Sequence, residues 1–210
     1  MSIKLYPIFL KLENISCCVI GGGAVALRKV KSLLESRARV TVVSPELCAG
    51  LKSLKKKKLF IHEKHKYQKK FIRGKFLVIA ATNDARVNKK AAVDAKARKI
   101  LVNVVDVPSE CNFYVPAVLH KNGISIAIST QGAFPGISRK IKEENWPVLK
   151  KYAKSLKRLA VLRKDIYASD KTCKKKKLFI KSLIRPDVLE MIKNKKNCNI
   201  NDLKAYLEAL

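Results

Sequence analysis

Short apolar runs alternate with amphipathic stretches over the first half of the chain. Four of the runs are too short for helices and apolar on both faces, which predicts buried strands. They lie at 16–20, 39–44, 76–82 and 100–106, and a weaker run lies at 59–62. Stretches with apolar residues at helical spacing separate them, at 25–36, 47–58 and 85–98. This alternation predicts an α/β fold with a Rossmann-like, doubly wound parallel sheet. Residues 5–12 are expected to form a short strand or an extended lead-in.

The pattern changes at Phe113. Two further apolar runs, 113–120 and 124–130, are joined by Asn122-Gly123, which is a strong hairpin signal. A helix is predicted from Ile137 to about Tyr152, and the remainder is helical by pattern and rich in lysine. We therefore predict a Rossmann-like domain at 1–112, a small α+β region at 113–150 and a helical C-terminal module at 151–210.

A glycine turn follows the first predicted strand. Gly21, Gly23 and Ala26 fit the G-x-G-x-x-A form of the dinucleotide fingerprint, which lays a pyrophosphate on the N-terminus of a helix. A tight strand-to-helix turn without a ligand has a similar pattern. The strand–helix–strand context near the N-terminus favours the dinucleotide site.

Polar residues and the glycine turn come at the ends of the predicted strands, where parallel sheets bind ligands. They are Gly21–Gly23, Ser44, Thr82 and Asp106. An NAD site usually has a carboxylate at the end of the second strand, but here Glu46 comes two residues late, after Ser44-Pro45. Either Glu46 or the backbone at Ser44 and Pro45 would hold the ribose. NADP stays open, although no arginine follows to receive its 2′-phosphate.

Asp106 is the leading candidate for catalysis. It ends the last parallel strand beside Asn103, where a carboxylate could accept a proton from a substrate or steer a metal ion. An aspartate that only caps a turn is an equally weighted reading. Ser129 and Thr130 begin a hydroxyl-rich loop that leads into a helix and suits the binding of carboxylates, although an N-cap and turn would need the same residues.

The formal net charge is +30, from 46 Lys and Arg against 16 Asp and Glu. The lysines are spread along the chain without interleaved aromatic residues, so nucleic acid is not the favoured partner. A compositional bias or an anionic small molecule would also account for the charge. The six cysteines form no C-x-x-C pair, and no metal site or disulfide is predicted. No membrane span or signal peptide is apparent, and a cytoplasmic protein is expected.

Several sequence pieces together resemble the precorrin-2 dehydrogenases, a family that includes the N-terminal part of siroheme synthase. The resemblance covers about residues 5–150. Its pieces are Tyr6–Phe9, Val19–Ala26 with Arg28-Lys29, Val40–Glu46, Ala80–Asp84, Asn103–Pro108, Phe113–Ala117, and Ser129–Gly132 with Pro135 and Arg139. Where the family usually has glycine, this chain has Arg37 and Gln131.

The resemblance implies NAD-dependent oxidation of precorrin-2 to sirohydrochlorin in siroheme or related tetrapyrrole synthesis. It assigns the role of acid and base to Asp106 and cofactor loops to Ala24-Val25 and Pro45-Glu46. Asn103, Ser129 and Thr130 are the predicted substrate contacts. Some members also insert ferrous iron, so chelation of Fe²⁺ or Co²⁺ stays open. Members are homodimers that exchange the hairpin region and the helix after it, which would make 113–150 a dimerisation region.

The implied substrate is a tetrapyrrole with eight carboxylates, which a basic protein would attract. The alternative is an NAD-responsive redox sensor or a nucleic-acid-binding regulator on the same fold. A regulator has no need of Asp106 or of the hydroxyl-rich loop.

Overall fold

The computed structural model describes the chain except for residues 1–3, 170–172, 195–198, 200, 203–204 and 206–210. The chain forms two compact units. The first comprises residues 1–115 with 131–133, and the second comprises residues 116–130 with 134–210. None of the described helices is long and apolar enough to cross a membrane.

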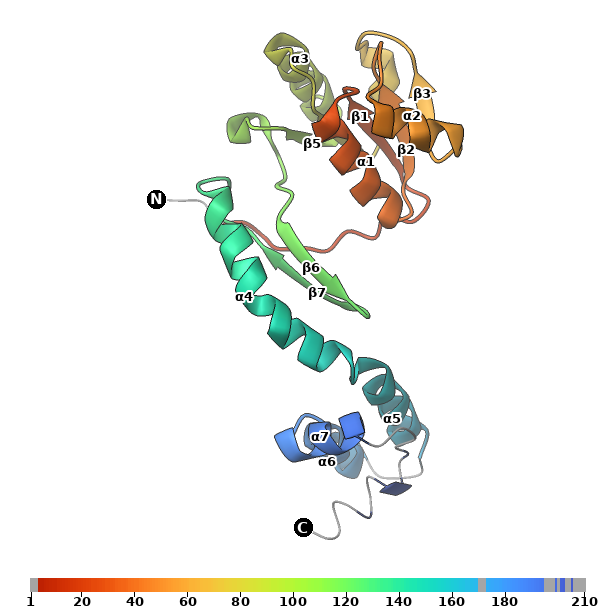
Figure 1. Ribbon diagram of the computed structural model, residues 1–210, viewed down its shortest axis with the longest axis vertical. Coiled ribbons are helices and arrows are strands. Elements are labelled where there is room, and N and C mark those ends of the chain that lie inside the picture. The colour runs from red at the N-terminus through yellow and green to blue at the C-terminus, as the bar shows by residue number, and fades with distance from the viewer. Residues whose placement is uncertain (1–3, 170–172, 195–198, 200, 203–204, 206–210) are drawn as a thin grey trace. The chain divides into compact units, whose positions relative to one another are not determined.

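The first unit is a five-stranded, wholly parallel sheet in the order β3-β2-β1-β4-β5 (Figure 1). Its strands are β1 (Ser16–Ile20), β2 (Arg39–Val43), β3 (Ile61–Glu63), β4 (Leu77–Ala80) and β5 (Leu101–Val104). Its α-helices are α1 (Ala24–Glu35), α2 (Ala49–Lys56) and α3 (Ala85–Lys96), and two short 3₁₀ helices are η1 (Lys69–Ile72) and η2 (Pro108–Glu110). The chain begins in the centre, proceeds to one edge and then crosses to β4, so the switch point lies between β1 and β4. The predicted Rossmann-like parallel sheet is confirmed.

Side chains alternate between the two faces of the sheet along each strand, and both faces are buried because helices cover them. Cys17 and Val19 face a core that α1 and α2 complete, whereas Cys18 and Ile20 face a core shared with α3. Both thiols are fully buried. Burial raises the pKa of the Cys17 thiol to about 11 and that of Cys18 to about 12. These two cysteines are therefore neutral core residues.

The described residues before β1 form no strand. Of the two expectations for residues 5–12, the extended lead-in is therefore the one observed. The strands also end earlier than the sequence pattern predicts, since Ser44, Thr82 and Asp106 lie just beyond β2, β4 and β5.

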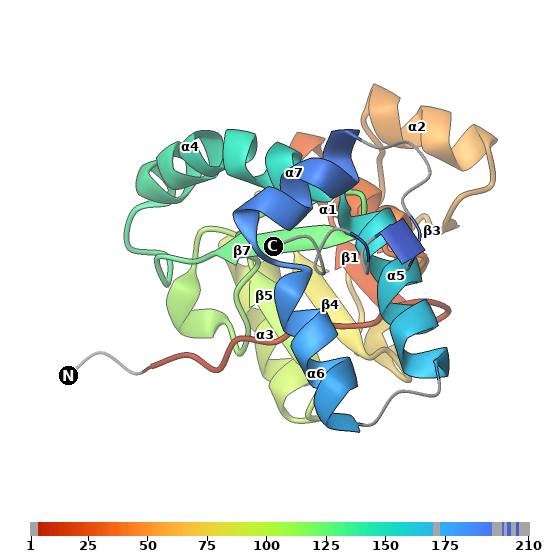
Figure 2. The ribbon, with the colours of Figure 1, turned by 90° about the horizontal axis from the view of Figure 1, so that it is seen from below.

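The second unit starts with a hairpin of β6 (Ala117–Lys121) and β7 (Ile124–Ile128). The predicted turn at Asn122-Gly123 is present, and both residues have positive φ, 47° and 87°. The helices that follow are α4 (Pro135–Ala153), α5 (Leu156–Ala168), α6 (Cys173–Ser182) and α7 (Pro186–Asn194). Figure 2 shows the last three of these helices from below. Buried residues of α5, of α7 and of the turn between α6 and α7 form a small core: Leu162, Ile166, Leu183, Val188 and Ile192. The three-part division at residues 112 and 150 stays a prediction.

Candidate dinucleotide-binding site

Four strands of the first unit end at the same level. The parallel register places Ile20 opposite Val43 and Ala80, and it places Ala80 opposite Val104. The next residue of each strand therefore leaves the sheet at one common edge. These residues are Gly21, Ser44, Ala81 and Val105. Of the predicted site residues, Gly21 and Ser44 stand at this edge, and Gly23, Glu46, Thr82 and Asp106 follow within two residues of it.

The three glycines of the turn have different surroundings. Gly21 has a φ of +123°, and a Cβ there would collide with the carbonyl oxygen of Ala81. A Cβ on Gly22 would collide with the carbonyl oxygen of Glu46. A Cβ on Gly23, in contrast, would meet no atom within 4 Å. The first two glycines allow close packing of the chain, and the third leaves open space at the start of α1.

The N-terminus of α1 is open to an anion. Gly23 provides no side-chain cap, and the first turn contains no acidic residue. The first helical bond runs from the Leu27 N–H to the Gly23 carbonyl at 3.0 Å, so the N–H groups of Ala24 and Val25 have no acceptor in the helix. Helix α3 differs, because the Asp84 carboxylate caps it by accepting bonds from two backbone N–H groups. Those bonds lower the pKa of Asp84. Of these two helix ends, only that of α1 has room for a pyrophosphate.

The loop after β2 folds back over the glycine turn. Ser44 is buried; its N–H donates to the Glu63 carbonyl at 3.1 Å, and its hydroxyl donates to the Glu46 carbonyl at 2.6 Å. The Cys48 N–H donates to the Gly22 carbonyl at 2.8 Å. Pro45 and Glu46 are exposed. Glu46, whose carboxylate comes two residues later than in a usual NAD site, therefore contacts the glycine turn through its backbone.

His62 is a contributor to this loop that the sequence did not reveal. Its Nε2 lies 2.9 Å from the Ser44 carbonyl oxygen, and its Nδ1 lies 3.1 Å from Nζ of Lys55. The Ser44 carbonyl and the lysine ammonium require Nε2 to be the donor and Nδ1 the acceptor. His62 stands on β3 opposite Val42, so its closeness to Ser44 follows from strand register. No local motif could have identified it.

Thr82 is held at the same edge by Asn88 of α3. The Asn88 side-chain oxygen accepts bonds from the Thr82 N–H at 3.2 Å and from its hydroxyl at 2.7 Å. The Asn88 side-chain nitrogen donates to the Thr82 carbonyl at 2.9 Å. The threonine hydroxyl is thus engaged within the protein, and Asn88 is a second positioning residue that the sequence did not reveal.

Asp106 lies two residues beyond β5, exposed and with a φ of +61°. Its charge interacts electrostatically with Lys29 of α1. Burial lowers the pKa of the Lys29 ammonium and the Arg28 charge lowers it further, whereas Asp106 and Cys111 act in the opposite direction. Asn103 is buried and donates to the Phe113 carbonyl at 3.1 Å. Asp106 therefore presents an exposed carboxylate within the electrostatic reach of Lys29, and Asn103 supports the segment after it.

Ser129 and Thr130 follow β7 in the second unit. The Thr130 hydroxyl oxygen accepts a bond from the Ser138 hydroxyl at 3.2 Å. Their assignment to the substrate side stays a prediction. Gln131, which stands where the family usually has glycine, has a φ of 56°. Within the described ranges, no three His, Cys, Asp or Glu side chains gather as metal ligands would.

A glycine turn at the switch point of a parallel sheet, with an open helix N-terminus beside it, defines a dinucleotide-binding protein of the Rossmann type. The family described as "Putative NAD(P)-binding" matches residues 8–117. The chain belongs to this NAD(P)-binding family. The family and the fold together assign a nicotinamide cofactor.

Siroheme synthases are among its curated relatives. The one from Thioalkalivibrio sulfidiphilus is 40% identical over 140 residues, which cover 67% of this chain and 29% of the relative. The one from Vesicomyosocius okutanii is 30% identical over 204 residues, 97% of this chain and 43% of the relative. The chain thus spans less than half the length of both relatives. The solved structure of SirC, precorrin-2 dehydrogenase, matches over 98% of each chain with a TM-score of 0.76 and 26% identity. The resemblance to the precorrin-2 dehydrogenases is confirmed.

Proposed function

We propose that this chain is an NAD-dependent dehydrogenase that oxidises precorrin-2 to sirohydrochlorin. The observation that carries the proposal is the common edge of the sheet. There an open helix N-terminus suited to a pyrophosphate and an exposed carboxylate, Asp106, follow strands that end at one level. The likeness to SirC over nearly the whole chain supports the choice of substrate. The regulator that the charge suggested has no comparable support.

The reaction removes a hydride and a proton from precorrin-2, and it yields sirohydrochlorin, NADH and H⁺. NAD⁺ supplies the hydride acceptor when it is bound. Asp106 is proposed to accept the proton, since its carboxylate is exposed at the edge of the sheet. The Lys29 ammonium, which interacts electrostatically with Asp106, adds a positive charge that suits a substrate rich in carboxylates.

NAD rather than NADP is proposed on the basis of the loop after β2. Residues 44–48 contain no lysine or arginine to receive a 2′-phosphate, and Glu46 is exposed there. A carboxylate at this place binds ribose hydroxyls and repels a phosphate. Gly21, Gly23, Ala24 and Val25 are proposed to hold the pyrophosphate, with Ser44, Pro45, Glu46 and Thr82 around the rest of the cofactor.

A homodimer is proposed from the second unit. Helix α4 packs against the hairpin, but several apolar side chains of this unit are still exposed. They are Val118, Phe134, Ile137 and Ile141. A second copy that covers them would complete the unit. Asn103, Ser129 and Thr130 are proposed substrate contacts, and Fe²⁺ or Co²⁺ would be the metal substrate if the chain also chelates.

The test is Asp106→Asn, assayed anaerobically with precorrin-2 and NAD⁺. Asparagine tolerates a left-handed backbone, so the fold should persist. We expect kcat to fall by about 10²–10⁴-fold, the range for a general acid–base group, while NADH fluorescence titration shows unchanged binding. Glu35→Gln, an exposed carboxylate at the end of α1, is the control and should keep full activity.

An unchanged rate for Asp106→Asn would overturn the role of Asp106, and a wild-type chain without turnover would overturn the proposed reaction. The wild type and Asp106→Asn, each mixed with sirohydrochlorin and Fe²⁺ or Co²⁺, test whether the chain also chelates. Metal insertion by the wild type that the variant lacks would show that one carboxylate serves both reactions.

A further inference from the structure

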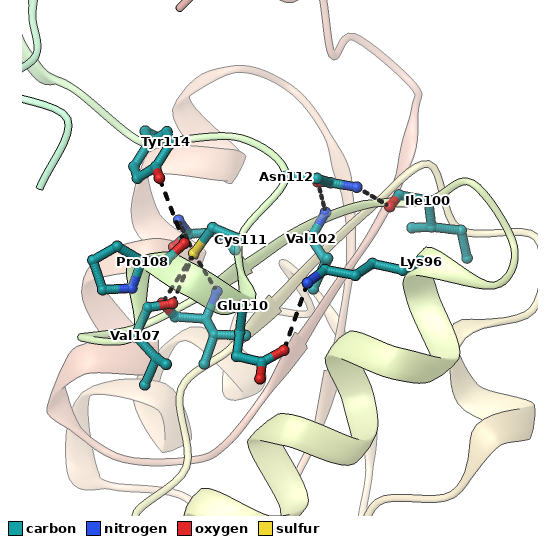
Figure 3. Close-up of polar contacts among 11 residues, drawn as sticks. Lys96, Ile100, Val102, Val107, Pro108, Glu110, Cys111, Asn112 and Tyr114 are labelled. Atoms are coloured by element: carbon teal, nitrogen blue, oxygen red, sulfur yellow. Dashed lines mark hydrogen bonds and ion pairs between the residues drawn. The ribbon is translucent and has the colours of Figure 1, made fainter. Parts of the chain in front are cut away.

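The segment after Asp106 is fastened to the outer edge of β5 by two consecutive side chains (Figure 3). Asn112 forms the first attachment. Its side-chain oxygen accepts a bond from the Val102 N–H at 2.7 Å, and its side-chain nitrogen donates to the Ile100 carbonyl at 3.0 Å. Its own N–H donates to the Val102 carbonyl at 3.0 Å. Asn112 thus pairs with the beginning of β5, away from Asp106.

Cys111 forms the second attachment, at the end of β5. Its Sγ accepts a bond from the Val104 N–H at 3.2 Å, and the Asn103 side-chain nitrogen lies 3.4 Å away. The thiol lies 3.3 Å from the Val104 carbonyl oxygen and 3.4 Å from that of Val107. Its single proton can serve only one of these carbonyls at a time. The two carbonyls stand on either side of Asp106 in the chain, so the thiol spans the residue proposed to be catalytic.

This arrangement compensates for an unfavourable backbone conformation. Asp106 is left-handed, with a φ of +61°, a conformation that aspartate and asparagine adopt more readily than other residues with a side chain but that still costs free energy. The Val107 N–H bond to the Val104 carbonyl, at 3.3 Å, closes a turn around it, and the thiol contacts the ends of that same turn.

We propose that Cys111 is a positioning residue, which fixes the direction of the Asp106 carboxylate by holding the backbone on both sides of it. The inference rests on the proposed function, because it gives Asp106 its catalytic role. Burial raises the pKa of the Cys111 thiol, and the Val104 bond opposes that shift only in part. The group therefore keeps its proton, and with it the ability to donate, at neutral pH.

The test compares Cys111→Ala with Cys111→Ser in the dehydrogenase assay. We expect kcat to fall about tenfold in Cys111→Ala with the KM for NAD⁺ unchanged, because Cys111 touches neither the glycine turn nor the Ser44 loop. Serine keeps a donor and an acceptor and should restore part of the rate. Asn112→Ala is the matched control, since it removes bonds of the same segment at the other end of β5. It should lower Tm and leave kcat unchanged.

The double variant Cys111→Ala with Asp106→Asn separates positioning from a general loss of structure. If Cys111 acts through Asp106, its removal should cost nothing further once Asp106 is replaced. Provided that the wild type is active, either of two results would overturn the inference. One is full kcat in Cys111→Ala, and the other is a tenfold loss of kcat when Cys111→Ala is added to Asp106→Asn. A wild type without turnover would overturn the proposed function, and this inference with it.

Discussion

Replacement of Gly23 by aspartate should stabilise the first unit and weaken dinucleotide binding at the same time. Gly23 is the N-cap of α1, and its φ of −85° and ψ of −172° are extended values that any residue adopts. A Cβ there meets no atom within 4 Å. An aspartate carboxylate should therefore reach the N–H groups of Val25 and Ala26, as Asp84 does at the start of α3.

The two effects can be estimated from the same N–H groups. Aspartate is better than glycine at an N-cap by a few tenths of a kcal/mol, and its charge at a helix N-terminus contributes a further 0.3–1 kcal/mol or so. A gain of about 0.5–1 kcal/mol should raise Tm by about 2 °C for a chain of this size. A pyrophosphate would lose charge-assisted bonds worth about 1.5–3 kcal/mol, which corresponds to affinity for NADH about 10–100-fold weaker.

Thermal unfolding followed by circular dichroism and NADH fluorescence titration measure the two quantities. Gly23→Asn is the control, because asparagine caps a helix with a side chain of the same size and no charge. It should gain stability and lose less affinity than Gly23→Asp. Wild-type affinity in Gly23→Asp would refute the placement of the pyrophosphate on α1. A lower Tm would refute the open N-cap.

Two further predictions concern backbone strain and the loop after β2. Arg37 has a φ of 57°, and its exposed ion pair with Glu13 is lost in either of two substitutions. Because glycine adopts this φ without strain, Arg37→Gly should be more stable than Arg37→Ala by about 1 kcal/mol. Equal urea midpoints for the two variants would contradict this. His62→Phe removes the donor to the Ser44 carbonyl and should weaken NADH binding about fivefold, whereas His62→Gln should retain most of the affinity. The exposed His65, which stacks on Phe71, is the control; equal losses in His65→Phe would contradict a role for the Ser44 contact.

The sequence predicted the sheet because its signals are local. Apolar runs such as Cys17–Ile20 must be buried on both faces, and the helices between them show their apolar stripes within a few turns. The sequence predicted the ends of the strands less accurately. The apolar pattern places Thr82 in a strand, but its backbone N–H bonds to the Asn88 side chain instead, and Asp106 leaves the sheet in a left-handed conformation. The pattern of apolar residues reveals neither of these backbone conformations.

Only the part of the candidate site that lies at the ends of the strands could be predicted from the sequence. Parallel strands bring Gly21, Ser44 and Asp106 to one edge in any doubly wound sheet. The residues that hold them there depend on contacts between distant parts of the chain or on the path of a loop. His62 reaches Ser44 through the register of β2 and β3, and Cys111 reaches Val104 only because the segment after Asp106 folds back along β5.

The late carboxylate and the three consecutive glycines have one explanation. The fingerprint requires Gly21 for the sharp turn and Gly23 for the approach of the pyrophosphate, but it leaves the residue between them free. In this chain the carbonyl oxygen of Glu46 occupies the space that a side chain on Gly22 would need. The loop after β2 can therefore lie against the turn, with the exposed Glu46 two residues beyond Ser44. Any side chain at position 22 would displace this loop, so the middle glycine is required by the packing of the loop that carries Glu46, the residue proposed to bind the ribose.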